Sequence, residues 1–209
     1  MAQKKANTSN MSAIRKITVT AIMTAIAILL QYVEFPIPML IPAFIKLDFS
    51  DMPELLTSFA LGPWYGALVA ILKNLIHLPF TSSAGVGELS NALLGVIFVV
   101  PAGYIYKAKG AKTRKHALLG SLAGAATMAV TSFPLNMFLV YPAYVKVYGM
   151  PMEGIIGMYS AILPAVHTLP QALFIFNVPF TLIKGLLDVA ITFIIYKRIS
   201  PLIKGTAKN

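Results

Sequence analysis

Long stretches without a charged residue alternate with short polar segments along this chain of 209 residues. The uncharged stretches cover residues 17–32, 55–72, 89–106 and 117–145. A helix needs about 20 mainly apolar residues to cross the hydrocarbon core of a bilayer. A helix that is apolar on every side must also be buried on every side. The pattern therefore predicts an all-α membrane protein that spans the bilayer several times.

Prolines and glycines divide these stretches into six predicted helices. We expect them over residues 15–33, 50–62, 63–78, 88–107, 115–138 and 173–197. The second and third are short for a full span, so we expect tilted or partial crossings. A count of four crossings stays open if these two form one re-entrant hairpin, but we favour six. Residues 34–50 and 139–170 are predicted as irregular outer connections, because prolines interrupt both.

The positive charge is gathered in three places. The chain has 17 Lys and Arg, 7 Asp and Glu, and a formal net charge of +10. Most of the basic residues lie in segments 4–16, 107–115 and 197–208, which contain no acidic residue. Because each segment adjoins an apolar stretch, this is the positive-inside pattern. It predicts that both termini and the middle loop are cytoplasmic, and it argues against a nucleic-acid partner.

Several kinds of chemistry are missing from the sequence. There is no cysteine, and the three histidines lie far apart without metal-ligand spacing. No phosphate-binding glycine motif is present, so the chain cannot hold ATP by a known loop. We therefore predict no metal site, no cofactor and no catalysis. Any uphill work must draw on a partner or on an ion gradient.

A charged pair stands inside the last predicted helix. Lys184 and Asp188 lie one turn apart, and a charge in the membrane costs about 2.5–3.5 kcal/mol on insertion scales. One interpretation is an ion pair between the two, or a lysine that extends toward the interface. The other is a lysine that faces a polar cavity and holds a ligand oxygen. The residues alone leave both open.

Other polar residues mark the ends of predicted helices. Glu88 follows a Gly-Val-Gly turn, where capping and ligand binding are equally open, and Asn91 shares its face. Asn136 sits among apolar residues, and a buried amide needs a partner in the protein or in a heterocyclic ligand. We interpret Lys73, Asn74 and His77 mainly as outer-interface residues, in preference to a ligand role.

Small residues at four-residue spacing indicate close helix packing. Ala21 and Ala25 form such a pair on the first helix, and Gly120 and Gly124 form another on the fifth. The absence of bulk lets two helix backbones approach closely. We interpret the glycine pair as packing within the protein.

The order of several short segments resembles the riboflavin-specific S component of an energy-coupling factor (ECF) vitamin transporter. These segments are Phe35-Pro36-Ile37-Pro38 and residues 47–53, 59–63, 73–77, 81–89, 136–138 and 179–185. Each segment by itself is only a weak match to the family, but the order of the segments along the chain is specific. The resemblance covers nearly the whole chain.

The resemblance implies a substrate-capture subunit of a prokaryotic plasma membrane. It implies six helices, one riboflavin bound near the outer face and no catalysis. The implied partners are a transmembrane coupling subunit and two cytoplasmic ATPases, which use the ATP. The expected organisation is a disordered tail over 1–12, one substrate-binding transmembrane domain over 13–200 and a cytoplasmic tail over 201–209.

Family positions also suggest the site residues. Polar positions around the vitamin match Glu88, Asn136 and Lys184, while Thr181 stands where some relatives carry asparagine. Asn91 lies on the face of Glu88, and the loop from Leu40 to Lys46 is the expected lid. The strip of Ala21 and Ala25 is the expected docking surface for the coupling subunit.

Three alternatives remain at this point. An S component for another vitamin would share the fold. An ion-coupled secondary transporter would usually be larger and contain paired internal repeats. A membrane enzyme would need a nucleophile–base or metal constellation, and none is visible.

Riboflavin suits an apolar pocket with a few placed polar groups, because it joins a flat ring with an imide edge to a hydroxylated chain.

Overall fold

The computed structural model describes residues 13–108 and 113–204, with side chains up to residue 196. The predicted disordered tail over 1–12 lies outside the described residues. Of the predicted cytoplasmic tail, residues 201–204 continue the last helix and the rest lies outside the described residues.

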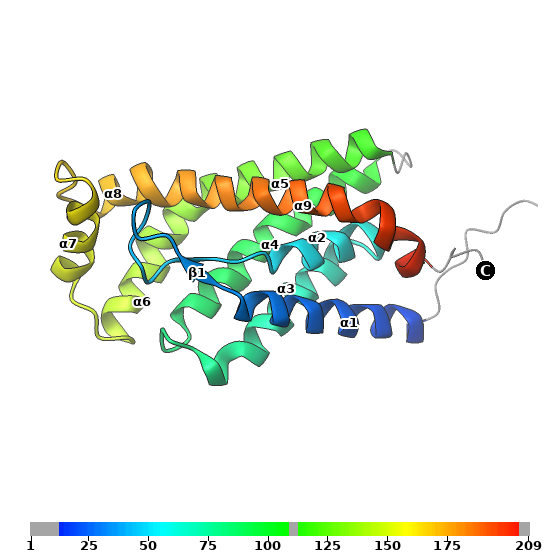
Figure 1. Cartoon of the computed structure of the whole chain (residues 1–209), viewed down its shortest axis with the longest axis horizontal. Helices are drawn as coiled ribbons and strands as arrows, with labels where there is room; N and C mark the ends of the chain where they lie inside the picture. Colours follow the sequence, from blue (N-terminus) through cyan, green and yellow to red (C-terminus); the bar gives the residue numbers. More distant parts are fainter. Residues whose placement is uncertain (1–12, 109–112, 205–209) are drawn as a thin grey trace, which may run out of the picture.

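Long apolar helices make up most of the bundle (Figure 1). They are α1 (Ala13–Tyr32), α4 (Val86–Lys107), α5 (Arg114–Leu135) and α9 (Val178–Lys204). With the short helices that extend two of them, the described residues contain four stretches long and apolar enough to cross a membrane. These stretches are Ala13–Tyr32, Val86–Lys107, Arg114–Lys146 and Leu169–Tyr196. The chain is therefore a mainly helical, multi-pass membrane protein.

Two shorter helices lie between α1 and α4. They are α2 (Asp51–Ala60) and α3 (Pro63–His77), and Gly62 separates them with a φ of +129°, which side chains rarely tolerate. Pro63 then opens α3 at a position where a missing N–H costs nothing. At 1.5 Å per residue, α2 reaches about half of the hydrocarbon thickness. It starts part-way along the bundle, after an extended segment (Figure 1).

The predicted irregular connection over 139–170 is wrong. Helix α5 continues through a π turn, η3 (Asn136–Val140), into α6 (Tyr141–Lys146), and α7 (Met152–Ile162) follows. Then α8 (Leu169–Ala172) and a second π turn, η4 (Leu173–Asn177), lead into α9. Pro151 and Pro170 stand at or beside helix starts, where the missing N–H is tolerated. Pro142 lies inside the continuous helix, directly after the π turn η3, which changes the local hydrogen-bond pattern. Buried Tyr141, Ile155 and Tyr159 give the segment its own apolar core.

The bundle has two chemically different ends. At one end, β1 (Phe35–Pro36) pairs antiparallel with β2 (Lys46–Leu47), near the short turn η1 (Leu78–Phe80) and helices α6, α7 and α8 (Figure 1). We call this the hairpin end. At the other, which we call the basic end, α1 begins, α4 ends, α5 begins and α9 ends (Figure 1). The described parts of all three basic segments therefore lie together.

Close packing of α4 on α5 accounts for the glycine pair. A Cβ on Gly120 would lie 2.5 Å from the carbonyl oxygen of Ala102, and one on Gly124 would lie 2.3 Å from that of Phe98. No side chain fits at such distances. The prediction that this pair packs within the protein is confirmed.

Candidate functional site

A cavity opens at the hairpin end between α4, the α5–α6 helix, α9 and the segment after α1. Its empty space is about 940 Å³, including the open mouth. Segments far apart in the sequence supply its walls, and most of the predicted site residues lie among them.

One wall is polar, and the other is aromatic. The polar wall comes from the loop before α4 and from the first turns of α4 itself. It contains Ser82, Ser83, Glu88, Ser90 and Asn91. The aromatic wall contains Phe44, Val140, Tyr141, Tyr144 and Phe180. Phe44 packs edge-on against Tyr144 at 5.3 Å and against Tyr141 at 6.2 Å between ring centroids. This division favours a ligand with a flat apolar part and a hydroxylated part.

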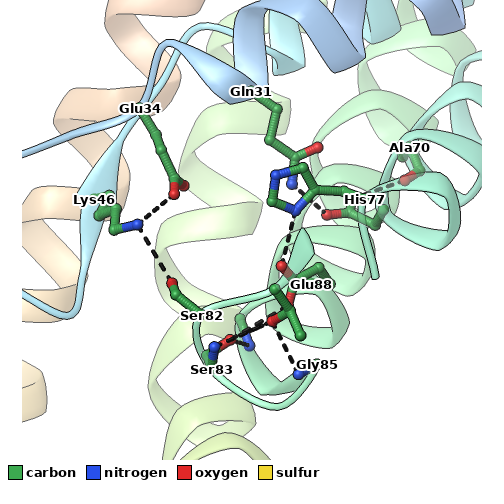
Figure 2. A network of polar contacts seen from close by, with 12 residues as sticks. Gln31, Glu34, Lys46, Ala70, His77, Ser82, Ser83, Gly85 and Glu88 are labelled. Carbon is green, nitrogen blue, oxygen red and sulfur yellow. Dashed lines mark hydrogen bonds and ion pairs between the residues drawn. The ribbon is translucent and has the colours of Figure 1, made fainter. Parts of the chain in front are cut away.

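Glu88 lines the cavity, but its carboxylate is already engaged (Figure 2). Oε1 lies 2.9 Å from Nδ1 of His77, and Oε2 accepts hydrogen bonds from Thr81 at 2.6 Å and Ser83 at 3.3 Å. Thr81 in turn accepts from the main chain of Gly85, whose φ of +84° lets the loop turn back. Glu88 therefore fixes the loop that forms the polar wall.

An ion pair stands at the mouth of the cavity (Figure 2). Lys46 of β2 pairs with Glu34, which follows α1, and Nζ of Lys46 lies 3.4 Å from the hydroxyl of Ser82. In the predicted lid, residues 44–46 line the cavity, whereas Leu40 is 61% exposed and lies outside the lining. The pair joins three segments around the entrance.

The floor of the cavity is ionic. Nζ of Lys184 lies 3.1 Å from Oδ2 of Asp48 and 3.1 Å from Oδ2 of Asp51. Nζ of Lys73 lies 2.7 Å from Oδ1 of Asp51 and 2.6 Å from Oε1 of Glu54. All five side chains are buried, and we call them the buried ion cluster. Because α2 starts half-way along the bundle, it brings its acids level with the middle of α9.

The cluster decides between the two interpretations of Lys184. The interpretation of Lys184 as the ion-pair partner of Asp188 is wrong. Lys184 pairs with Asp48 and Asp51 and also lines the cavity. In the part of the chain that the structure describes, neither oxygen of Asp188 has a hydrogen-bond partner. The acids that hold Lys184 lie more than 130 residues away in sequence, where helical spacing gives no signal.

The interpretation of Lys73, Asn74 and His77 as outer-interface residues is also wrong. Lys73, Asn74 and His77 are all buried, at 0%, 3% and 5% exposure. Asn74 accepts a hydrogen bond from Gln31 of α1 at 3.1 Å, and His77 contacts Glu88 (Figure 2). Their polar atoms support the site from behind instead of facing the membrane surface.

Three predicted residues face the cavity with unused polar atoms. Among the described residues, no hydrogen bond engages the side chains of Asn91, Asn136 or Thr181, although all three line the cavity. Buried polar groups normally find partners. These side chains are therefore available to a ligand.

A third carboxamide of the cavity lining, Asn177, was not predicted. It lines the cavity from the end of η4 and bonds to the hydroxyls of Tyr141 and Tyr159. One signal was present in the sequence: Asn136 and Asn177 each lie two residues from a proline inside an apolar stretch. Both fall in π turns, which are frequent at functional sites.

The predicted docking strip lies on the surface of α1. Ala21 and Ala25 are exposed, whereas Met23, Thr24 and Ala27 between and beside them are buried. Exposed Ile22, Ile26 and Leu29 extend this face.

No group of three or more His, Asp or Glu side chains in the described residues is placed to hold a metal ion.

Known proteins resemble the chain over nearly its whole length. It is 31% identical over 195 residues to the riboflavin transporter RibU of Staphylococcus aureus (strain TCH60), covering 93% of this chain and 95% of that protein. It is 27% identical over 194 residues to the riboflavin transporter FmnP of Bacillus subtilis (strain 168), covering 91% and 95%.

A solved structure and a family model agree with these relatives. A bacterial ECF transporter S component superposes with a TM-score of 0.72 at 30% identity, covering 92% of this chain and 99% of that one. Residues 15–196 match the model of the family described as ECF transporter, substrate-specific component. The chain belongs to the substrate-specific (S) component family of ECF transporters.

Proposed function

We propose that this chain is the substrate-capture subunit of an ATP-driven ECF transporter and that its ligand is riboflavin. The observation that carries the proposal is a cavity lined by aromatic side chains, by serine hydroxyls and by two carboxamides, Asn91 and Asn136, that make no hydrogen bond among the described residues. The names of the relatives from Staphylococcus aureus and Bacillus subtilis support riboflavin in particular.

The two walls suit the two parts of the vitamin. The flat ring of riboflavin packs on Phe44, Tyr141 and Phe180, while the ribityl hydroxyls face the serines and Asn91 of the polar wall. The carboxamide of Asn136 complements the imide edge, since it offers both a donor and an acceptor. Lys184 donates from the floor, and Thr181 adds one hydroxyl beside it.

Transport needs partners that supply energy. The sequence has no phosphate-binding loop, so a coupling subunit and two cytoplasmic ATPases provide the ATP-driven step. Family membership supports this division of labour. The exposed strip at Ala21 and Ala25 is the proposed surface for the coupling subunit. The chain itself performs no catalysis and uses no cofactor of its own.

The proposed setting is the plasma membrane of a prokaryote, with six crossings and the basic end in the cytoplasm. In Figure 1, helices α1, α2, α3, α4, α5 and α9 run alternately toward the two ends, which supports six passes. The cavity then opens outward.

This orientation predicts the side from which a cysteine is labelled. The chain has no cysteine, so one placed at Ala111 is the only target. We expect an impermeant maleimide to label it in inverted vesicles and not in intact cells. Labelling from outside intact cells would reverse the orientation.

The site predicts which substitutions weaken riboflavin. Replacing Asn136 or Lys184 with alanine should lower affinity about tenfold to a hundredfold, because an unpaired buried group costs about 1–3 kcal/mol. Glu88→Gln should be milder, since a glutamine keeps part of the loop contacts. Quenching of riboflavin fluorescence by detergent-purified protein measures each dissociation constant.

Lys146→Ala is the matched control, because Lys146 is exposed and does not line the cavity. It should bind riboflavin as the unaltered protein does. If Asn136→Ala and Lys184→Ala are folded and also bind normally, the site assignment is wrong. Titration with thiamine, biotin and folate tests the alternative that this chain is an S component for another vitamin.

A further inference from the structure

Three side chains from different helices form a closed ring of hydrogen bonds beside the aromatic wall. Tyr141 of α6, Tyr159 of α7 and Asn177 at the end of η4 are 1%, 0% and 5% exposed. The hydroxyl of Tyr159 donates to Oδ1 of Asn177 at 2.5 Å, and Nδ2 of Asn177 donates to the hydroxyl of Tyr141 at 2.9 Å. A hydrogen bond between the two hydroxyls completes the ring.

The placement of the Asn177 amide oxygen and nitrogen sets the direction of every bond in the ring. A tyrosine hydroxyl has one hydrogen, and that of Tyr159 is used on Asn177. The hydroxyl of Tyr141 must therefore donate to Tyr159. Each hydroxyl donates once and accepts once, and the ring leaves one hydrogen of the Asn177 amide unused. Rings of this kind strengthen each bond through polarisation.

The unused amide hydrogen is on the nitrogen, which is the end of the carboxamide that contacts a cavity-lining residue. Asn177 and Tyr141 line the cavity, whereas Tyr159 does not. The Nδ2 end of the carboxamide is bonded to the cavity-lining tyrosine, and the Oδ1 end is bonded to the buried one. Tyr159 thus holds the amide oxygen on the buried side, and the amide nitrogen lies next to the tyrosine that lines the cavity.

We propose that Tyr159, from outside the cavity, positions the Asn177 carboxamide to donate a hydrogen bond to a ring carbonyl oxygen of the bound flavin. This inference rests on the proposed function. A ring carbonyl is the acceptor because Asn177 is bonded to Tyr141 of the aromatic wall, where the flat part of the ligand packs. Helix α7, which the sequence pattern did not predict, then takes part in ligand selection.

Removing one oxygen tests the proposal. Tyr159→Phe keeps the aromatic ring, including its packing on Phe176 at 5.4 Å between centroids, and removes only the hydroxyl that holds Oδ1. We expect about tenfold weaker riboflavin binding, the loss typical of a misplaced buried hydrogen bond. We expect the same loss with lumiflavin, which has the same ring but no ribityl chain. Tyr148→Phe, at a tyrosine that is 43% exposed and lies outside the cavity lining, is the matched control.

A double-substitution cycle separates positioning from general stability. In an Asn177→Ala background, Tyr159→Phe should cause no further loss of affinity, because the group that it positions is gone. An additive loss would show that Tyr159 only supports the fold and would overturn the proposal. So would normal binding by Tyr159→Phe, or a loss with riboflavin that disappears with lumiflavin. Failure of the unaltered protein to bind riboflavin would instead refute the proposed function.

Discussion

Replacing Ala21 and Ala25 together with tryptophan should abolish riboflavin uptake while the purified protein still binds riboflavin with nearly unchanged affinity. Both alanines are exposed on α1 and lie one turn apart, so they form a flat strip. Lipid chains are as apolar as leucine, so helices in a bilayer associate mainly through close packing. Two indole rings on this strip would keep the coupling subunit at a distance. The cavity is lined by other elements and should be unaffected.

Uptake by cells that express the full complex, beside titration in detergent, measures both effects. Ala126→Trp is the matched control, since Ala126 is an exposed alanine on α5 and should tolerate tryptophan without loss of uptake. Loss of binding in the double variant would mean that the strip packs within the protein. Normal uptake would mean that another face docks.

Removal of the Lys73 ammonium group should have the largest effect on stability. Nζ of Lys73 is the cation that contacts both Asp51 and Glu54, and its side chain is fully buried. Breaking a buried pair by removing one partner typically costs about 3–5 kcal/mol, because the remaining charge is left without compensation. We expect Lys73→Met to lower the unfolding temperature strongly in detergent or to prevent folding.

Companion variants make this result interpretable. Lys146→Met removes an exposed lysine and should leave the unfolding temperature unchanged. Lys73→Met combined with Glu54→Gln and Asp51→Asn should recover part of the lost stability, because the unpaired charges are removed as well. An unchanged unfolding temperature for Lys73→Met alone would show that the buried ion cluster contributes little.

The helical fold was largely readable from the sequence, because apolar length is a strong signal in membrane proteins. The breaks at Gly62 and the short α2 and α3 were predicted for the same physical reason that they occur. The sequence pattern predicts neither α6 nor α7, because a proline ordinarily ends a helix. Here Pro151 directly precedes the start of α7, and Pro142 follows the π turn η3 inside a continuous helix. Sequence spacing does not distinguish the two cases.

The candidate site was predictable only where a polar residue interrupts an apolar stretch. Asn136 and Lys184 were found in this way and line the cavity together with Thr181. The partners of Lys184 were not found, because Asp48 and Asp51 are far from it in sequence. The extended segment between α1 and α2 brings them next to Lys184 only in the folded protein. Tyr159 was likewise hidden, since a tyrosine in an apolar segment gives no sign of what its hydroxyl bonds.

The central claim is that this chain by itself binds riboflavin in the cavity at the hairpin end. Titration of the purified protein with riboflavin, followed by flavin fluorescence without ATP or partner subunits, tests it most directly. The account predicts saturable quenching at one site per chain, weakened by Asn136→Ala and unaffected by ATP. Absence of saturable quenching by a folded protein would contradict it.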